Sequence, residues 1–269
     1  MTFSFSLNRL RNIPIFSHVP AVQESERLYR APQFTPEVLA SVRRISTCLN
    51  LKANESSRLL WEAESNNASL VEYRALLPLF EKMQRPRKVL EIGAGLGRSI
   101  VIFGKKHVWD ENAEVHLYDT NGDQTKYKQK HYDSPPKWPD VSSFCGDLAL
   151  LKAILQENGV PNFTIHDAAQ HELKTLPGPF DLIYGFYSIG FHWSLEHYLD
   201  DIDPLMDERS ILICTLNKHF EPFPRLKNYS ARILEAAGTK KGARPLSFLA
   251  LSKGPLPEAG RPVEEAFSA

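Results

Sequence analysis

The spacing of hydrophobic positions changes near residue 85, and this change divides the chain into two parts. From Pro36 to about Met83, apolar residues recur at helical intervals, which predicts two or three helices that end before Arg85. From Lys88 onward, short apolar runs alternate with amphipathic segments. Such alternation is typical of an α/β fold in which a doubly wound, mostly parallel sheet carries helices on both faces.

Six apolar runs in the second part predict strands, and helical periodicity is found between several of them. The strands are expected at 88–92, 115–118, 163–166, 180–184, 210–215 and 246–251. The helices are expected at 99–103, 148–156, 193–206 and 230–237. Ligands of such sheets bind where the parallel strands end, so the residues that follow each strand are the first candidates for a functional site.

The same patterns predict three regions. An arm and helical cap occupy 1–84, the α/β domain occupies 85–254, and the tail at 255–269 is expected to be disordered. Within the arm, residues 1–34 combine prolines with aromatic residues and are interpreted as an extended lead-in. Residues 121–146 are polar and proline-rich, too long for a simple connection, and are interpreted as an irregular excursion.

The composition excludes some broad classes of protein. The 269 residues include 32 basic and 32 acidic side chains, and this balance argues against nucleic-acid binding through bulk charge. Three scattered cysteines, Cys48, Cys145 and Cys214, do not suggest a disulfide framework or a cysteine-rich metal site. No apolar run approaches membrane-spanning length, and the first residues lack the apolar core of a signal segment. We therefore expect a cytoplasmic protein.

The stretch KVLEIGAGLGRSI, at 88–100, places three glycines at alternate positions directly after a predicted strand. Gly93, Gly95 and Gly97 predict a turn in which the backbone comes close to a ligand. A dinucleotide site would have the spacing G-x-G-x-x-G, and a P-loop would end in G-K-[ST]. The chain has neither pattern here, so both of these nucleotide-binding classes are disfavoured.

The glycine stretch resembles motif I of the class I S-adenosylmethionine-dependent methyltransferases, whose form is E/D-x-G-x-G-x-G. The resemblance extends over about residues 86–253 and implies a seven-stranded Rossmann-like sheet with S-adenosylmethionine as cofactor. The residues that it assigns to the cofactor lie at or just after the ends of the first four predicted strands. They are Glu91, Gly93, Ala94, Gly95, Gly97, Asp119, Thr120, Asp167, Ala168 and Gly185.

The resemblance also implies separate roles for the three acids. Asp119 corresponds to the residue that accepts hydrogen bonds from the ribose hydroxyls, and a carboxylate suits a diol because it only accepts. Asp167 corresponds to the acid that meets the adenine amino group. Glu91 supports the glycine turn or the cofactor's ammonium group. Taken one at a time, either aspartate could instead simply cap a helix.

The stretch GFYSIGFHWSLEHYLDD, which follows the fourth strand, is where we expect the methyl acceptor. His192 is the candidate general base, because an alcohol acceptor must lose a proton and histidine is the residue that most often removes it. An ordinary hydrogen-bonded histidine in a helix N-terminal turn is the alternative. Tyr187, Phe191 and Trp193, with Trp61 from the cap, are candidate pocket walls, although aromatic residues also dominate ordinary cores.

We therefore predict transfer of a methyl group to a small molecule, with a hydroxyl of a sugar or natural product as the favoured acceptor. The alternatives are methylation of a protein or RNA, or a cofactor-binding regulatory protein that has lost transfer activity. No metal is predicted, because the carboxylate pattern of catechol-type enzymes is incomplete: Asp181 lies within its strand and Asn217 alone follows the fifth. The N-P-P-Y signature of amino-methylating enzymes is replaced by residues 185–188, GFYS, so no DNA partner is expected. No membrane partner is expected either, and a homodimer is left open.

Overall fold

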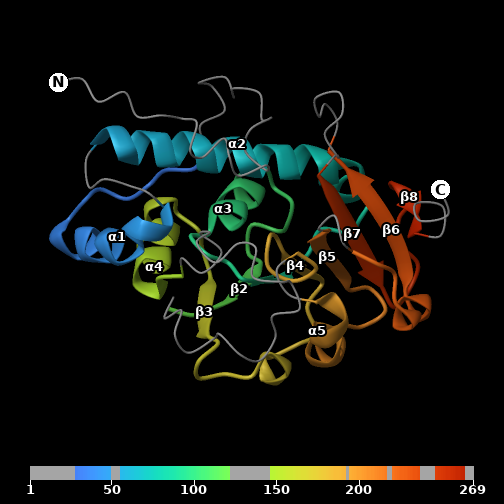
Figure 1. The fold of residues 1–269 in the computed structure, drawn as a ribbon. Coiled ribbons are helices and arrows are strands. Elements are labelled where there is room, and N and C mark those ends of the chain that lie inside the picture. Colours follow the sequence, from blue (N-terminus) through green and yellow to red (C-terminus); the bar gives the residue numbers. More distant parts are fainter. Residues whose placement is uncertain are drawn as a thin grey trace.

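The fold is built around one eight-stranded sheet (Figure 1). The computed structural model describes residues 28–49, 55–121, 146–191, 194–216, 220–236 and 246–263. Its strands are β1 (Lys88–Ile92), β2 (Glu114–Asp119), β3 (Phe163–Asp167), β4 (Leu182–Gly185), β5 (Ile211–Leu216), β6 (Ser230–Glu235), β7 (Ser247–Ser252) and β8 (Arg261–Pro262). Their order across the sheet is β3-β2-β1-β4-β5-β7-β6-β8.

The strands from β1 to β5 form a parallel array, as the sequence pattern predicts. β1 pairs in parallel with β2 on one side and with β4 on the other, and the outer strands β3 and β5 continue the array. β7 is antiparallel to both β5 and β6. The strand order reverses between β1 and β4, and in doubly wound sheets the carboxyl ends of the strands at such a reversal form a binding crevice.

Helices cover both faces of this sheet (Figure 1). They are α1 (Pro36–Leu49), α2 (Glu55–Phe80), α3 (Arg98–Lys105), α4 (Leu148–Glu157) and α5 (Leu195–Ile202). One hydrophobic cluster joins side chains of α1 to α4 with one face of the strands, and a second cluster joins α5 with the other face. Among its described residues, the region of the expected cap contains two helices, α1 and α2, and α2 packs against α3.

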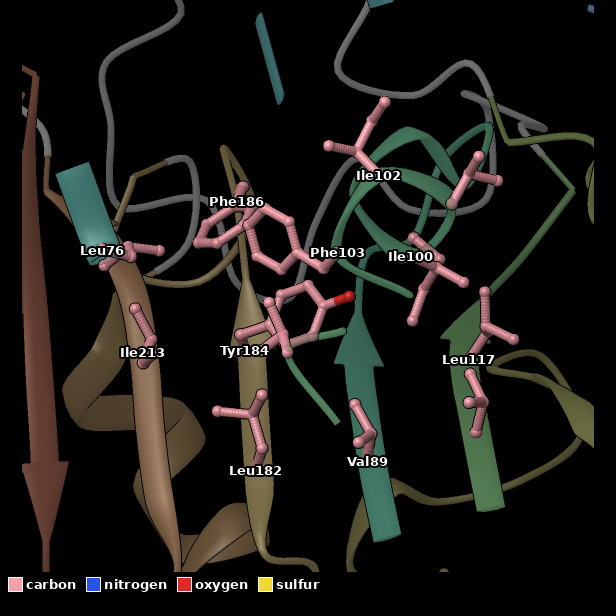
Figure 2. Close-up of a cluster of buried hydrophobic side chains, with 14 of the residues drawn as sticks. Leu76, Val89, Ile100, Ile102, Phe103, Leu117, Leu182, Tyr184, Phe186 and Ile213 are labelled. Atoms are coloured by element: carbon pink, nitrogen blue, oxygen red, sulfur yellow. The ribbon is translucent and has the colours of Figure 1, made fainter. Parts of the chain in front are cut away.

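The core on the α2 side is rich in aromatic side chains (Figure 2). The ring centroid of Phe103, from α3, lies 5.7 Å from that of Tyr184 and 5.7 Å from that of Phe186. Leu76 from α2 belongs to the same buried cluster. Along β4, Leu182 and Tyr184 face this cluster while Ile183 faces the other one. The strand is therefore buried on both faces, which explains why its sequence shows no polar alternation.

The helix expected at 230–237 is wrong, because this segment forms the strand β6. The sequence ARILEAA contains good helix formers, but β6 pairs with β7 along its whole length, from Ser230 to Glu235. Ile233 belongs to one hydrophobic cluster and Leu234 to the other, which is the two-residue period of a strand. Tertiary pairing has overridden local propensity here.

Two other boundaries also differ from the sequence pattern. The helix expected at 193–206 is shorter: α5 ends at Ile202, and a 3-10 turn follows at Asp203–Leu205. The tail expected to be disordered from residue 255 instead includes a strand within its described residues, because β8 pairs with β6 and Val263 is buried. Residues 1–27 of the predicted lead-in and 122–145 of the predicted excursion lie outside the described residues. Over the described part of the chain, no helix combines the length and apolar character needed to cross a membrane.

Candidate functional site

The glycine turn, residues 93–97, lies between the end of β1 and the start of α3. Gly93, Gly95 and Gly97 all have positive φ, at 72°, 55° and 65°. A Cβ atom on Gly93 would lie 2.5 Å from the Cβ of Ser188, and one on Gly97 would meet the side chain of Leu151 at 2.8 Å. A Cβ on Gly95 would meet nothing within 4 Å. Two of the glycines therefore allow close packing, whereas the middle one borders open space.

Asp119, at the end of β2, connects the second strand to the glycine turn. One carboxylate oxygen accepts a hydrogen bond from the backbone N–H of Gly95, and the other accepts one from Thr120 at 2.7 Å. Burial, together with the nearby Asp167, raises the pKa of Asp119 above its ordinary value, although these two N–H donors oppose the rise. A side chain on Gly146 would collide with the carbonyl of Thr120, so the chain also closes tightly against this strand end.

Asp167 fixes the corresponding end of β3. Its carboxylate accepts hydrogen bonds from the Thr120 hydroxyl at 2.9 Å and from the Ala169 N–H at 3.0 Å. The N–H of Ala168 donates to the backbone carbonyl of Asp119 at 2.8 Å. The structure thus brings together four predicted residues at the carboxyl ends of β2 and β3, next to the glycine turn. They are Asp119, Thr120, Asp167 and Ala168.

Glu91 is a buried acid that joins β1 to the helix after the turn. Its carboxyl group accepts hydrogen bonds from the Ser99 hydroxyl in α3 and, at 3.4 Å, from the Tyr184 hydroxyl in β4. Burial raises the pKa of Glu91 to about 8, and the Ser99 hydrogen bond opposes that rise. At neutral pH this carboxyl group is therefore mainly protonated, and it supports the turn from beneath.

The segment after β4 packs closely against the glycine turn. A Cβ on Gly185 would lie 2.6 Å from the Ser188 hydroxyl, which donates a hydrogen bond to the carbonyl of Ile92 at 2.7 Å. Tyr187 has a positive φ of 57°, which is costly for a residue with a side chain. Phe191, half-buried, stands edge-on to Tyr187 with ring centroids 5.2 Å apart.

An ion pair between the buried Glu72 and the partly buried Arg98 fastens α2 to this part of the site. Both guanidinium NH2 groups of Arg98, the first residue of α3, donate to the carboxylate of Glu72 at 2.6 Å, and one of them also donates to Ser69 at 2.7 Å. The guanidinium lies 5.6 Å from the ring centroid of Tyr187, whose hydroxyl is also a hydrogen-bond partner of Glu72. Glu72 therefore joins the cap helix, the glycine turn and the segment after β4.

The remaining predicted residues are placed less directly. Ala94 is buried within the turn. Trp61 is buried in α2, where its ring centroid lies 6.2 Å from that of Tyr29, so its role as a pocket wall stays a prediction. His192 and Trp193 lie outside the described residues. Among the residues that are described, no three His, Cys, Asp or Glu side chains are grouped so that they could hold a metal ion.

The sequence pattern did not identify several residues of this site, namely Tyr29, Ser69, Glu72, Arg98, Ser99 and Ser188. One signal was available. Arg98 places a positive charge at the first position of a helix, where the helix dipole disfavours a cation. Such a residue calls for an acid from another element, which is the role that Glu72 performs here.

Comparisons with known proteins give a limited result. No protein-family model and no curated protein match the chain. Similar solved structures include precorrin-6y C5,15-methyltransferase from Geobacter metallireducens, with 16% identity, 70% of this chain and 89% of that chain covered, and a TM-score of 0.42. A ribosomal protein L11 methylase from Lactobacillus delbrueckii subsp. bulgaricus has 17% identity, 69% and 80% coverage, and a TM-score of 0.41. At these identities and TM-scores the similarity says nothing about the activity of this chain.

Proposed function

We propose that this chain, whose mostly parallel sheet is that of the Rossmann-like class I methyltransferases, transfers a methyl group from S-adenosylmethionine to a small-molecule acceptor. The observation that carries the proposal is the hydrogen bond between Gly95 in the glycine turn and Asp119 at the end of β2. It brings the two most characteristic parts of the sequence resemblance into one site, and Gly95 borders the open space that a ligand requires.

The residues at this edge fit the proposed cofactor. The glycine turn lets the backbone approach the amino-acid part, and the Asp119 carboxylate, with two lone pairs on each oxygen, can accept from ribose hydroxyls beside its two backbone donors. Asp167 and Ala168 are close by for the base, and Gly185 lets the segment after β4 pack closely against the end of β1. When bound, S-adenosylmethionine supplies an activated methyl group on a sulfonium. The protein then chiefly orients the acceptor and excludes water.

The acceptor is proposed to be a hydroxyl, in a sugar or another natural product. His192 is the proposed general base: it would take the hydroxyl proton as the new oxygen–carbon bond forms and the sulfur–carbon bond breaks. Tyr187 and Phe191, whose rings meet edge to face, are proposed to form part of the pocket wall, with Trp193 and Trp61 as further candidates. Flat aromatic faces suit the apolar faces of sugar rings, which supports this choice of acceptor.

Calorimetric titration with S-adenosylmethionine, and separately with its demethylated product, tests the cofactor assignment. We expect the wild type to bind both with micromolar dissociation constants, which correspond to a binding free energy on the order of −8 kcal/mol. Asp119→Asn keeps the size of the side chain but removes part of its acceptor capacity, so binding should weaken about tenfold or more. Absence of binding in the wild type would refute the proposed function.

A matched control comes from Asp207, another acid that caps backbone N–H groups. Asp207 accepts from the N–H groups of Arg209 and Ser210 in a turn before β5. Asp207→Asn should leave cofactor binding unchanged, which separates loss of a ligand contact from loss of a cap. With binding established, sugars and phenols can be screened for methyl acceptance. His192→Ala should then abolish turnover on a hydroxyl acceptor while cofactor binding persists, and retained turnover would remove His192 as the base.

A further inference from the structure

Residues 28–31, which we call the strap, have no regular secondary structure and do not pair with any strand of the described sheet. All eight backbone N–H and C=O groups of the strap nevertheless form hydrogen bonds, and each partner is a side chain. Asn66 binds the N–H of Leu28 and both backbone groups of Tyr29, and Lys105 donates to the carbonyl of Leu28. Asn158 binds both backbone groups of Arg30. The N–H of Ala31 donates to Glu62, and the carbonyl of Ala31 accepts from Arg58.

These partners lie on α2, on α3 and at the end of α4 (Figure 1). Arg58, Glu62 and Asn66 are spaced four residues apart and therefore form a row along one face of α2. Lys105 is the last residue of α3, and Asn158 directly follows α4. Asn66 alone makes four hydrogen bonds, at 2.7 to 3.1 Å. The strap is thus held as specifically as a strand in a sheet, although it belongs to none.

Tyr29 is the side chain through which the strap reaches the glycine turn. Its ring is completely buried, and its hydroxyl donates a hydrogen bond to the carbonyl of Leu96 at 3.3 Å. The same peptide group is held from its other side, because the N–H of Gly97 donates to the carbonyl of Ala94 at 2.8 Å. The peptide between Leu96 and Gly97 is therefore fixed at both ends, in the same five-residue turn as the Gly95 N–H that donates to Asp119.

We propose that Tyr29 is a positioning residue, which holds the glycine turn in its ligand-ready geometry from the strap. The turn on its own is conformationally flexible, since three of its five residues are glycines with positive φ. A turn held in advance loses less conformational entropy when a ligand binds, so its affinity is higher. The effect on the ligand rests on the proposed function; the effect on the turn does not.

Tyr29→Phe tests this directly, because it removes the hydroxyl and keeps the buried ring. Two quantities are measured on the full-length protein: amide hydrogen exchange of residues 93–97 without any ligand, and the dissociation constant of S-adenosylmethionine. One hydrogen bond lost from the turn should raise the exchange of its amides and weaken cofactor binding, each about fivefold. Asn66→Ala releases the strap itself and should produce the same two changes at larger size.

Tyr229→Phe is the matched control. The Tyr229 hydroxyl donates to Asp203 at 2.6 Å, on the α5 side of the sheet, so this variant also loses one tyrosine hydrogen bond. If the role of Tyr29 is purely structural, both variants should lose similar stability, and they should not differ in amide exchange at 93–97 or in cofactor affinity. This result would overturn the proposal. Faster exchange with unchanged affinity would overturn the link to the ligand. Faster exchange in a protein that binds no S-adenosylmethionine would retain the positioning role and refute the proposed function.

Discussion

Glu91 makes the stability of the protein depend on pH in an unusual direction. It is almost completely buried, between Ser99 and Tyr184, and its pKa is raised to about 8 from an ordinary value of 4.5. Below the ordinary value the carboxyl is protonated in both the folded and unfolded states, so it creates no difference between them. As the pH rises above that value, the unfolded chain ionises first, and the folded state loses relative stability until the pH passes about 8.

The interval between the two pKa values sets the size of the effect. Each pKa unit corresponds to about 1.4 kcal/mol, so raising the pH from about 5 to about 9 should cost the folded state on the order of 4 kcal/mol through Glu91. Glu91→Gln carries a neutral group of the same shape, which can still pair with the Ser99 and Tyr184 hydroxyls. It should remove this loss. The variant should therefore be similar to the wild type near pH 5 and clearly more stable near pH 9.

The measurement is urea denaturation of both proteins across this pH range, with the free energy of unfolding compared at each pH. Glu172, whose side chain is mostly exposed, provides the control, and Glu172→Gln should follow the wild type throughout. A stability difference between Glu91→Gln and the wild type that stays constant with pH would refute the reasoning. It would mean that Glu91 has the same protonation in the folded and unfolded states.

Three further changes test other parts of the structure. Glu72→Ala removes the carboxylate from the partly buried Arg98 guanidinium, so urea denaturation should show a loss of about 1.5–3 kcal/mol, and removing both side chains should cost less than the two single losses combined. Gly93→Ala forces a Cβ into a neighbouring side chain at a positive φ and should lower the free energy of unfolding by about 2 kcal/mol; an unchanged value would contradict the observed packing. His116 and His166 stack with ring centroids 5.1 Å apart, and burial lowers the pKa of both, so stability should fall as the pH drops below their ordinary value of 6.5. His166→Gln should reduce that acid-side loss in the same assay, and an unchanged acid-side slope would show that this pair does not titrate on unfolding.

The sequence predicts those parts of the site that depend on local pattern. Asp119 and Asp167 end apolar runs, and the glycines follow another, so the parallel arrangement of strands alone brings them to one edge. No comparable rule pairs Arg98 with Glu72, or Tyr29 with Leu96, because these contacts join elements that are far apart in the chain. They depend on how α2 and the strap lie over the sheet, and a single sequence does not encode that placement in any local spacing.

The misassigned strand β6 has a similar cause. Its residues favour a helix when considered alone, and only the neighbouring strand β7 makes the extended form better. β8 has two residues, too few for any periodicity to be recognised. Local pattern was thus sufficient for the buried strands with clear apolar runs, which include the antiparallel β7, and insufficient for β6 and β8, where the pairing partner decides the conformation.

The short strand β8 also protects the molecule from other copies of itself. β6 would be an edge strand without it, and an edge with unpaired N–H and C=O groups is a template for intermolecular pairing and aggregation. β8 bonds to β6 beside Arg232 and Ile233, and its Pro262 lacks an N–H with which to extend the sheet. Truncation of the chain before residue 255 would remove β8 and expose β6. The truncated protein should therefore be prone to self-association.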